Sequence, residues 1–241
     1  MIQRRSMQQI SLLSLLLSFI PALLVIVYFV YHKLEYTTSL YAMARMILQL
    51  LMIGYLLIYI FQTQESLIVL TALSVMLIAA GWIALRTVPH LQKKLFFHAF
   101  ISILLGGGFT LMIITQFVLE VSPWYCADHI IPLAGMIFAN AMIAISLSAE
   151  RLHKELQMKQ SYESAFNDAL FAALIPITNS LFAVGLVSLP GMMTGQILSG
   201  ISPLIAARYQ MMVMAMIFGA SGLSVILFLR LSKQVFELKP R

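Results

Sequence analysis

The stretch Gly185–Gln210 reads GLVSLPGMMTGQILSGISPLIAARYQ and carries features that an ordinary membrane-spanning helix avoids. Pro190 has no backbone N–H and its ring disturbs the preceding helical turn, so we expect the helix to break at Pro190–Gly191. Hydrogen-bonding side chains, among them Gln196, follow the proline inside an otherwise apolar run. Interrupted helices at membrane depth occur where protein buries them or a polar cavity lies beside them, and they often mark the working part of a transporter.

The composition is that of a polytopic membrane protein. Of the 241 residues, 61% are hydrophobic and 10% are charged, whereas a soluble domain is about 45–50% apolar and about 25% charged. The net charge of +6 comes from basic residues between apolar runs, where they orient helices, and this argues against nucleic-acid binding. The single cysteine, Cys126, excludes an internal disulfide and a cysteine-based metal cage.

Seven apolar stretches predict an all-α fold, a polytopic transmembrane helical bundle that forms one membrane-embedded domain over residues 1–241. Each stretch has about 19–24 residues, close to the ~20 needed to cross a hydrocarbon core of ~30 Å. The longest polar gap, residues 149–168, leaves no room for a soluble domain, and no Walker-type GxxxxGK[ST] motif occurs. The expected spans are Ile10–Tyr31, Met43–Phe61, Leu67–Leu85, Phe96–Leu119, Ile130–Ser148, Phe171–Leu189 and Tyr209–Leu229.

The lysines and arginines between the spans predict the orientation, because cytoplasmic loops carry an excess of them. One side holds only Arg4, Arg5 and Arg208. The other side is therefore expected to be cytoplasmic, which places the N-terminus outside and the C-terminus inside. Its basic residues are Lys33, Arg45, Arg86, Lys93, Lys94, Arg151, Lys154, Lys159, Arg230, Lys233, Lys239 and Arg241.

Polar and soft side chains in or beside the spans are candidates for a transport path or gate. Polar groups in hydrocarbon need partners, so they either join helices by hydrogen bonds or line a polar path. Met192 and Met193 offer thioethers to a passing metal, or they fill gaps between packed helices, and both interpretations stay open. The candidates are Asn140, Asn179, Ser180, Pro190, Gly191, Met192, Met193, Gln196, Tyr209 and Gln210.

Two further patterns concern the second span and helix packing. Arg45 and Gln49 lie one helical turn apart, so they share a face at the expected cytoplasmic entry of that span, where Arg45 either makes a functional contact or extends toward the interface. Small residues at Gly106–Gly108, in the pair Gly135/Ala139 and in the pair Ala215/Gly219 predict close approach of neighbouring helices.

Enzymatic and proton-coupled functions find no support in the residue pattern. No carboxylate falls in the interior of an expected span, where a proton-coupled carrier or an intramembrane aspartyl protease needs one. The five histidines form no HExxH motif, and no internal repeat stands out. We therefore expect no catalytic residues in this chain.

Several segments resemble a known family. SLPGMMTGQIL at 188–198, SPLIAARYQ at 202–210, AALIPITNS at 172–180, AGMIFANAM at 134–142 and the RxxxQL pattern of Arg45–Leu50 are similar to the signature of the bacterial iron-export ABC permeases of the FetB type. That family includes uncharacterised UPF0014-like membrane proteins, and its plant relatives include an aluminium-tolerance permease. Ala139 stands where the family tends to have glycine.

The resemblance implies the permease subunit of a metal exporter in the bacterial inner membrane, most specifically an iron exporter. It implies a separate cytoplasmic ATP-binding subunit and two copies of the permease, with no cofactor bound by this chain and ATP used by the partner. The ATPase would contact the connector 149–168, where Glu150/Lys154 and Arg151/Glu155 form i,i+4 pairs; the contact candidates are Arg151, Lys154, Glu155 and Glu163.

One departure from the family leaves a second function open. The connector is shorter than in the family by about one helical segment and lacks the LGAT-like turn that often precedes the next span. A divergent, uncoupled membrane channel or an accessory membrane protein is the alternative, since neither needs an ATPase. No residue pattern in the sequence identifies the substrate.

Overall fold

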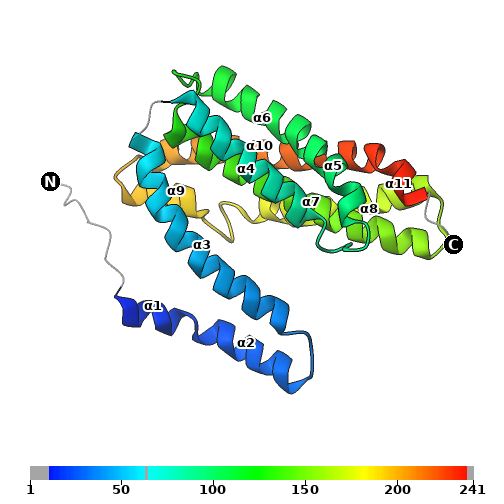
Figure 1. Ribbon diagram of the computed structural model, residues 1–241. Helices are drawn as coiled ribbons and strands as arrows, with labels where there is room; N and C mark the ends of the chain where they lie inside the picture. The colour runs from blue at the N-terminus through cyan, green and yellow to red at the C-terminus, as the bar shows by residue number, and fades with distance from the viewer. Residues whose placement is uncertain (1–10, 63–64, 238–241) are drawn as a thin grey trace. The chain divides into compact units, whose positions relative to one another are not determined.

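The computed structural model describes residues 11–62 and 65–237, which are helical almost throughout and contain no strand (Figure 1). These residues divide into two compact units, 11–62 and 65–237. Seven helical segments within them are long and apolar enough to cross a membrane, so the predicted all-α, polytopic transmembrane bundle is confirmed. Ile10, Arg4, Arg5, Lys239 and Arg241, which the predictions above used, lie outside the described residues.

The first unit consists of α1 (Leu12–Ser18), α2 (Ile20–Tyr31) and α3 (Thr37–Gln62). Ser11 starts α1, since its hydroxyl accepts a hydrogen bond from the backbone N–H of Ser14 at 3.2 Å. Pro21 occupies the first turn of α2, where its missing N–H is not needed. Together α1 and α2 supply the first candidate span and α3 supplies the second.

The second unit holds the other five spans and two short helices. The fourth span is one continuous helix, residues 92–118, in which two π-helical segments alternate with α-helix. The elements are α4 (Ser66–Ala84), α5 (Gln92–Ser102), η1 (Ile103–Gly107), α6 (Gly108–Met112), η2 (Ile113–Val118), α7 (Ala127–Gln157), α8 (Tyr162–Ala183), α9 (Gly191–Leu198), α10 (Pro203–Leu231) and α11 (Lys233–Glu237).

The core of this unit lies where α7 packs against α10, with α8, α4 and η1 around them. Small side chains on the facing surfaces let these helices approach each other closely. Close packing of this kind holds spans together, since helices in lipid gain no stability by burying apolar surface away from water. The small buried residues are Ala134, Ala141, Ala144 and Ala149 on α7, and Ala206, Ala220, Ser221 and Ser224 on α10.

Gly106 and Gly107 stand at the tightest of these approaches. A Cβ on Gly106 would lie 2.7 Å from the backbone nitrogen of Ser224 on α10, and one on Gly107 would lie 2.9 Å from the Cγ2 of Ile137 on α7. The predicted role of the 106–108 run in close packing therefore holds for its first two glycines. Gly219 has no such neighbour, since a Cβ there would meet nothing within 4 Å.

The sixth span is interrupted, but the interruption differs from the predicted break at Pro190–Gly191. The predicted span was Phe171–Leu189, whereas α8 ends at Ala183 and a loop of residues 184–190 follows. The Ala183 carbonyl accepts hydrogen bonds from the N–H groups of Val187 and Ser188, and Gly185 N–H donates to the Ser188 carbonyl at 2.9 Å. This turn pairs the carbonyl of Ala183, the last residue of α8, before the chain reaches Pro190, which is the extended N-cap residue of α9.

The predicted connector 149–168 is largely helical. α7 continues to Gln157 and α8 begins at Tyr162, so only the turn 158–161 separates them. The hydroxyl of Ser161 accepts from the N–H of Ser164 at 3.3 Å, and Glu163 lies in the first turn, where its charge favours the helix N-terminus. The i,i+4 pairs at 150–155 predict a helix here, and that helix is the continuation of α7.

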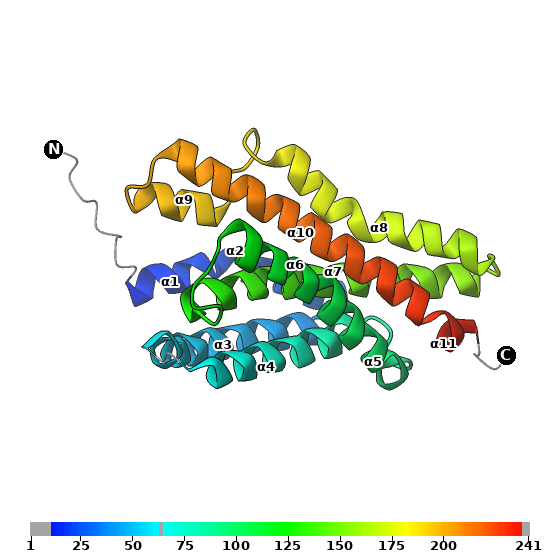
Figure 2. The ribbon, with the colours of Figure 1, turned by 90° about the horizontal axis from the view of Figure 1, so that it is seen from above.

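The helices of the second unit run back and forth between two ends that differ in charge. Figure 2 shows α9 and the start of α10 at one end, with α5 and α11 at the other. The basic end carries Arg86, Lys93, Lys94, Arg151, Lys154, Lys159, Arg230 and Lys233. The opposite end carries Glu65, Glu120 and Asp128, with Arg208 as its one lysine or arginine among residues 65–237.

We expect Gly106→Ala to lower the free energy of unfolding by about 1–3 kcal/mol, since its methyl group would overlap backbone that cannot move without shifting α10. Gly219→Ala is the matched control and should be neutral or slightly stabilising, because alanine favours helix. Unfolding of the purified protein in detergent, followed by circular dichroism during an SDS titration, measures both. Equal stability of the two variants would contradict the close approach.

Candidate functional site

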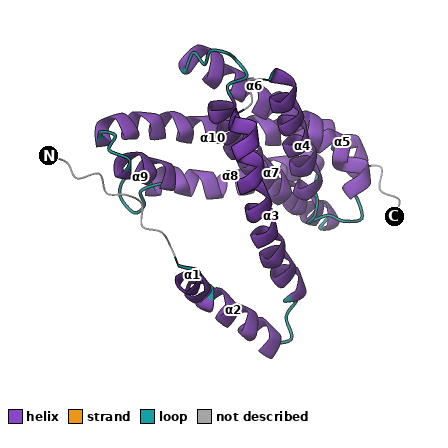
Figure 3. Ribbon diagram, turned by 60° about the vertical axis from the view of Figure 1, so that its left-hand side comes forward, coloured by secondary structure: helices purple, strands orange, loops and turns teal. Residues whose placement is uncertain are grey.

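The short helix α9 is held between two loops at the end opposite to the basic end (Figure 3). Pro190 begins it in an extended conformation, and its carbonyl accepts hydrogen bonds from the backbone N–H and the hydroxyl of Thr194. Gly200 ends it with φ +92°, and the N–H of Ile201 donates back to the Gln196 carbonyl at 3.0 Å. Pro203 then occupies the first turn of α10. These contacts fix the direction of each α9 side chain.

A cavity of about 450 Å³ lies on one side of α9, and we call it the α7–α9 cavity. It brings together Met192 and Gln196 of α9, which are one turn apart, and Tyr209 of α10. Gln196 is half-buried, and its Oε1 is buried without a hydrogen-bond partner among the described residues. Three of the predicted path residues therefore share one site, and one of them carries an acceptor that a ligand can use.

The start of α7 supplies the other polar groups of the α7–α9 cavity. Asp128 lies in the first helical turn and His129 follows it; both are exposed and both line the cavity. The Nδ1 of His129 lies 3.5 Å from the Sγ of Cys126. Pro132, Leu133 and Met136 of α7, with Leu119, complete the lining.

Asp128 and His129 are absent from the predicted site. Their position directly before the 134–142 motif, at the start of a span, was the available signal.

The donor set of the α7–α9 cavity is mixed. It offers a carboxylate, an imidazole, an amide oxygen, a phenol and the thioethers of Met136 and Met192. Among the described residues, no group of three or more histidines, cysteines, aspartates or glutamates stands close enough to hold a metal ion. Such an arrangement suits the weak and brief contacts that a passing cation requires.

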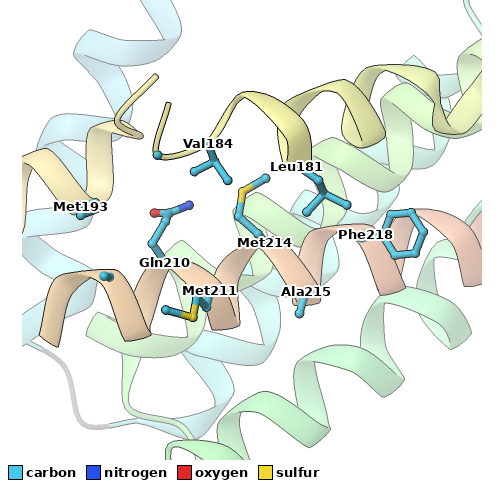
Figure 4. A pocket seen from close by; sticks show the side chains of 10 residues that line it. Leu181, Val184, Met193, Gln210, Met211, Met214, Ala215 and Phe218 are labelled. Carbon is cyan, nitrogen blue, oxygen red and sulfur yellow. The ribbon is translucent and has the colours of Figure 1, made fainter. Parts of the chain in front are cut away.

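A second hollow, which we call the α8–α10 groove, has a volume of about 560 Å³ and takes a different side chain of α9. Figure 4 shows the side chains that line it. It receives Met193 and Gln210, two more of the predicted path residues. The remaining lining is apolar and comes from the end of α8 and the face of α10. Met192 and Met193 thus serve different hollows, although they are neighbours in sequence.

The other predicted path residues lie outside both hollows. Asn140 is half-buried on α7 and donates its amide to the Met136 carbonyl of the same helix at 2.8 Å. Asn179 and Ser180 are exposed on α8, and the Ser180 hydroxyl donates to the Pro176 carbonyl. Pro190 and Gly191 shape the start of α9 without lining either hollow. Their roles in transport stay predictions.

The second-span candidates belong to the first unit. Arg45 and Gln49 both lie on α3, one turn apart and exposed, as the spacing predicts. Arg45 is eight residues into α3, about 12 Å from the start of the helix. Their role at a cytoplasmic entry also stays a prediction.

The candidate ATPase-contact residues cluster at the α7–α8 turn. Lys154 pairs with Glu150 at 2.7 Å, and Arg151 pairs with Glu155 at 2.6 Å, so both predicted i,i+4 pairs are present. Glu155 is only 4% exposed, so its side chain anchors Arg151 and does not face outward. Arg151, Lys154 and Glu163 are exposed. The hydroxyl of Tyr162 donates to the Leu229 carbonyl and ties the start of α8 to the end of α10.

Residues 10–236 match the model of an uncharacterised protein family, UPF0014. The chain belongs to the UPF0014 family. It is 34% identical over 212 residues to the probable iron export permease protein FetB of Escherichia coli, covering 82% of this chain and 80% of that protein. The resemblance inferred from the motifs is therefore confirmed.

Relatives of this kind also occur in cyanobacteria and plants. The chain is 35% identical over 202 residues to a UPF0014 membrane protein of Synechocystis, covering 78% of each. It is 33% identical over 202 residues to the protein ALUMINUM SENSITIVE 3 of Arabidopsis thaliana, covering 78% of this chain and 72% of that protein. No solved structure is significantly similar to this chain. Seven spans and membrane-protein relatives establish a multi-pass membrane protein.

Gly200→Ala should destabilise the protein by roughly 1–2 kcal/mol, because alanine at φ +92° brings its Cβ against the following carbonyl. Gly195→Ala is the matched control within α9; it is helical and a Cβ there meets nothing within 4 Å, so stability should not fall. Thermal unfolding in detergent compares the two, and a stable Gly200→Ala variant would argue against this turn.

Proposed function

We propose that this protein is the membrane permease subunit of an ABC-type exporter that moves metal cations, iron foremost, out of the cell. A separate cytoplasmic subunit would bind and hydrolyse ATP, so this chain would hold no cofactor and perform no catalysis itself. One observation carries the proposal: Met192, Gln196 and Tyr209 meet Asp128 and His129 in one cavity of a membrane-spanning unit. The name of the Escherichia coli relative, a probable iron export permease, supports iron as the cargo.

The charges of the second unit support a direction. Its basic end would face the cytoplasm, since lysine and arginine accumulate on that side of membrane proteins. The α7–α9 cavity would then open toward the outside of the bacterial inner membrane. In this orientation the C-terminus is cytoplasmic and, with seven spans, the N-terminus is outside.

The chemistry of the cavity fits the last step of cation export. A carboxylate at the outer end attracts a cation, and the free Oε1 of Gln196 accepts it without a competing hydrogen bond. The ligands are few and mixed, so binding would be weak enough for release. The thioether of Met192 would serve a softer ion better than iron.

The coupling route would run along α8. Its first turn lies at the α7–α8 turn, where the exposed Arg151, Lys154 and Glu163 would meet the ATPase. Its last turn leads through the loop 184–190 into α9. Closure of two ATPase subunits on a permease pair would shift α8 and carry α9, which lines the cavity, with it.

A second candidate is an uncoupled channel or accessory membrane protein. The short turn 158–161 favours this candidate, because it leaves no separate helix between α7 and α8 that an ATPase could contact. The two candidates differ in whether an ATP-binding subunit associates with this chain in the membrane.

Asp128→Asn should reduce iron efflux about tenfold or more, because the neutral amide no longer attracts a cation to the cavity. Glu65→Gln is the control, since Glu65 is an exposed carboxylate at the same end but outside the cavity. Loss of radioactive iron from preloaded cells measures the effect, with membrane levels of each variant checked by immunoblot. Unchanged efflux by Asp128→Asn would reject the cavity as the exit.

Reversing the charges of Lys154 and Glu163, as Lys154→Glu with Glu163→Lys, should abolish co-purification of the ATP-binding subunit from the membranes of the native cell. Both side chains are exposed, so the fold should persist. Arg208→Glu, an exposed residue at the opposite end, is the control and should retain the ATPase. If the unaltered protein recovers no ATPase, the uncoupled candidate gains; if the reversed variant still binds it, the contact lies elsewhere.

A further inference from the structure

The α8–α10 groove has the lining and the volume of a binding site for an apolar ligand. Its apolar walls include Leu181 and Val184 at the end of α8 and Phe218 on α10. Three methionines, Met193, Met211 and Met214, contribute flexible thioethers that adapt to the shape of an apolar ligand. The volume of about 560 Å³ lies within the range of small-molecule sites.

Gln210 supplies the polar group in this apolar surrounding. Its side chain projects from α10 toward the end of α8, between Met193 and Met214 (Figure 4). The residue is only 6% exposed, and its Oε1 is buried without a hydrogen-bond partner in residues 11–62 and 65–237. An unpaired buried amide is costly, so a ligand that pairs with it gains affinity at this point.

The position of Gln210 along α10 indicates the depth of the groove in the bilayer. Arg208 and Arg230 mark the two polar boundaries of this helix. Gln210 is 20 residues from Arg230, about 30 Å along the helix, so it lies at the edge of the hydrocarbon core. Phe218 lies eight residues further in, about 12 Å deeper. The groove therefore has its polar group at the depth of lipid ester groups and its apolar floor at the depth of acyl chains.

The two atoms of the Gln210 amide select among lipids. The Nε2 group donates and an ester carbonyl accepts from it, but Oε1 needs a donor. A diacyl phospholipid offers only ester acceptors at this depth and leaves Oε1 unpaired. A glycerolipid with one acyl chain has a free hydroxyl on the carbon next to its ester, and this pair of groups matches both amide atoms.

We propose that the α8–α10 groove binds one single-chain glycerolipid, a lysophospholipid or monoacylglycerol, with its ester and adjacent hydroxyl on Gln210 and its acyl chain directed toward Phe218. The bound chain contacts Met193 and so supports α9, which also lines the α7–α9 cavity through Met192 and Gln196. This site needs only a membrane-spanning protein and does not depend on metal export.

The test is native mass spectrometry of the purified full chain, titrated with 1-oleoyl lysophosphatidylglycerol. One saturable equivalent should bind, and Gln210→Leu should weaken it about tenfold, the effect of losing a buried hydrogen bond. The analogue with a 2-O-methyl group in place of the hydroxyl should bind as weakly to the unaltered protein. Gln116→Leu is the control, because Gln116 is an amide in another span and outside the groove.

A second variant tests the groove independently, in case Gln210→Leu does not fold. Ala215→Phe fills the groove without touching the amide and should remove the bound equivalent while the protein keeps its elution volume in gel filtration. Equal binding by unaltered protein and Gln210→Leu would overturn the site. Equal binding of dioleoyl phosphatidylglycerol would overturn the single-chain ligand, and a cross-linked second copy of the chain through Ala215→Cys would assign the groove to a protein interface.

Discussion

The second unit depends on the close approach of α7, α10 and the π-helical segment η1. Gly106 and Gly107 permit it, because any side chain there would overlap Ser224 or Ile137. In a bilayer, helices gain nothing by hiding apolar surface from water, so close packing of this kind holds spans together. With α7 and α10 fixed against each other, their N-terminal parts form two walls of the α7–α9 cavity.

The spans were predictable because hydropathy and length leave few alternatives for apolar runs of this size. Helix ends were less predictable. Pro190 is the strongest helix-breaking signal in its segment, yet α8 ends seven residues earlier, where N–H groups of the following loop bond to the Ala183 carbonyl. The charge pairs after Ser148 predicted a helix, but not that it would be continuous with the preceding span, because polar residues extend a helix without a break once it has left the hydrocarbon.

The candidate site was predictable only in part, since composition identifies polar residues near spans but not the direction of their side chains. Met192, Gln196 and Tyr209 do converge, whereas Asn140 bonds within its own helix and Asn179 is exposed. Asp128 and His129 join the site from a part of the chain more than 60 residues away, through the packing of α7 beside α9 and α10. No spacing within one segment contains that information.

Because different side chains of α9 line the α7–α9 cavity and the α8–α10 groove, the number of residues between Pro190 and Gly200 is constrained. One additional residue before Met192 would turn every later side chain of the helix by about 100° about its axis. Met193 would then no longer point into the α8–α10 groove, and Gln196 would leave the α7–α9 cavity. Segments between spans ordinarily absorb insertions and deletions. In α9, however, Pro190 and Gly200 fix the two ends of the helix and so the directions of its side chains. Changes of length should therefore be rarer here than changes of residue type.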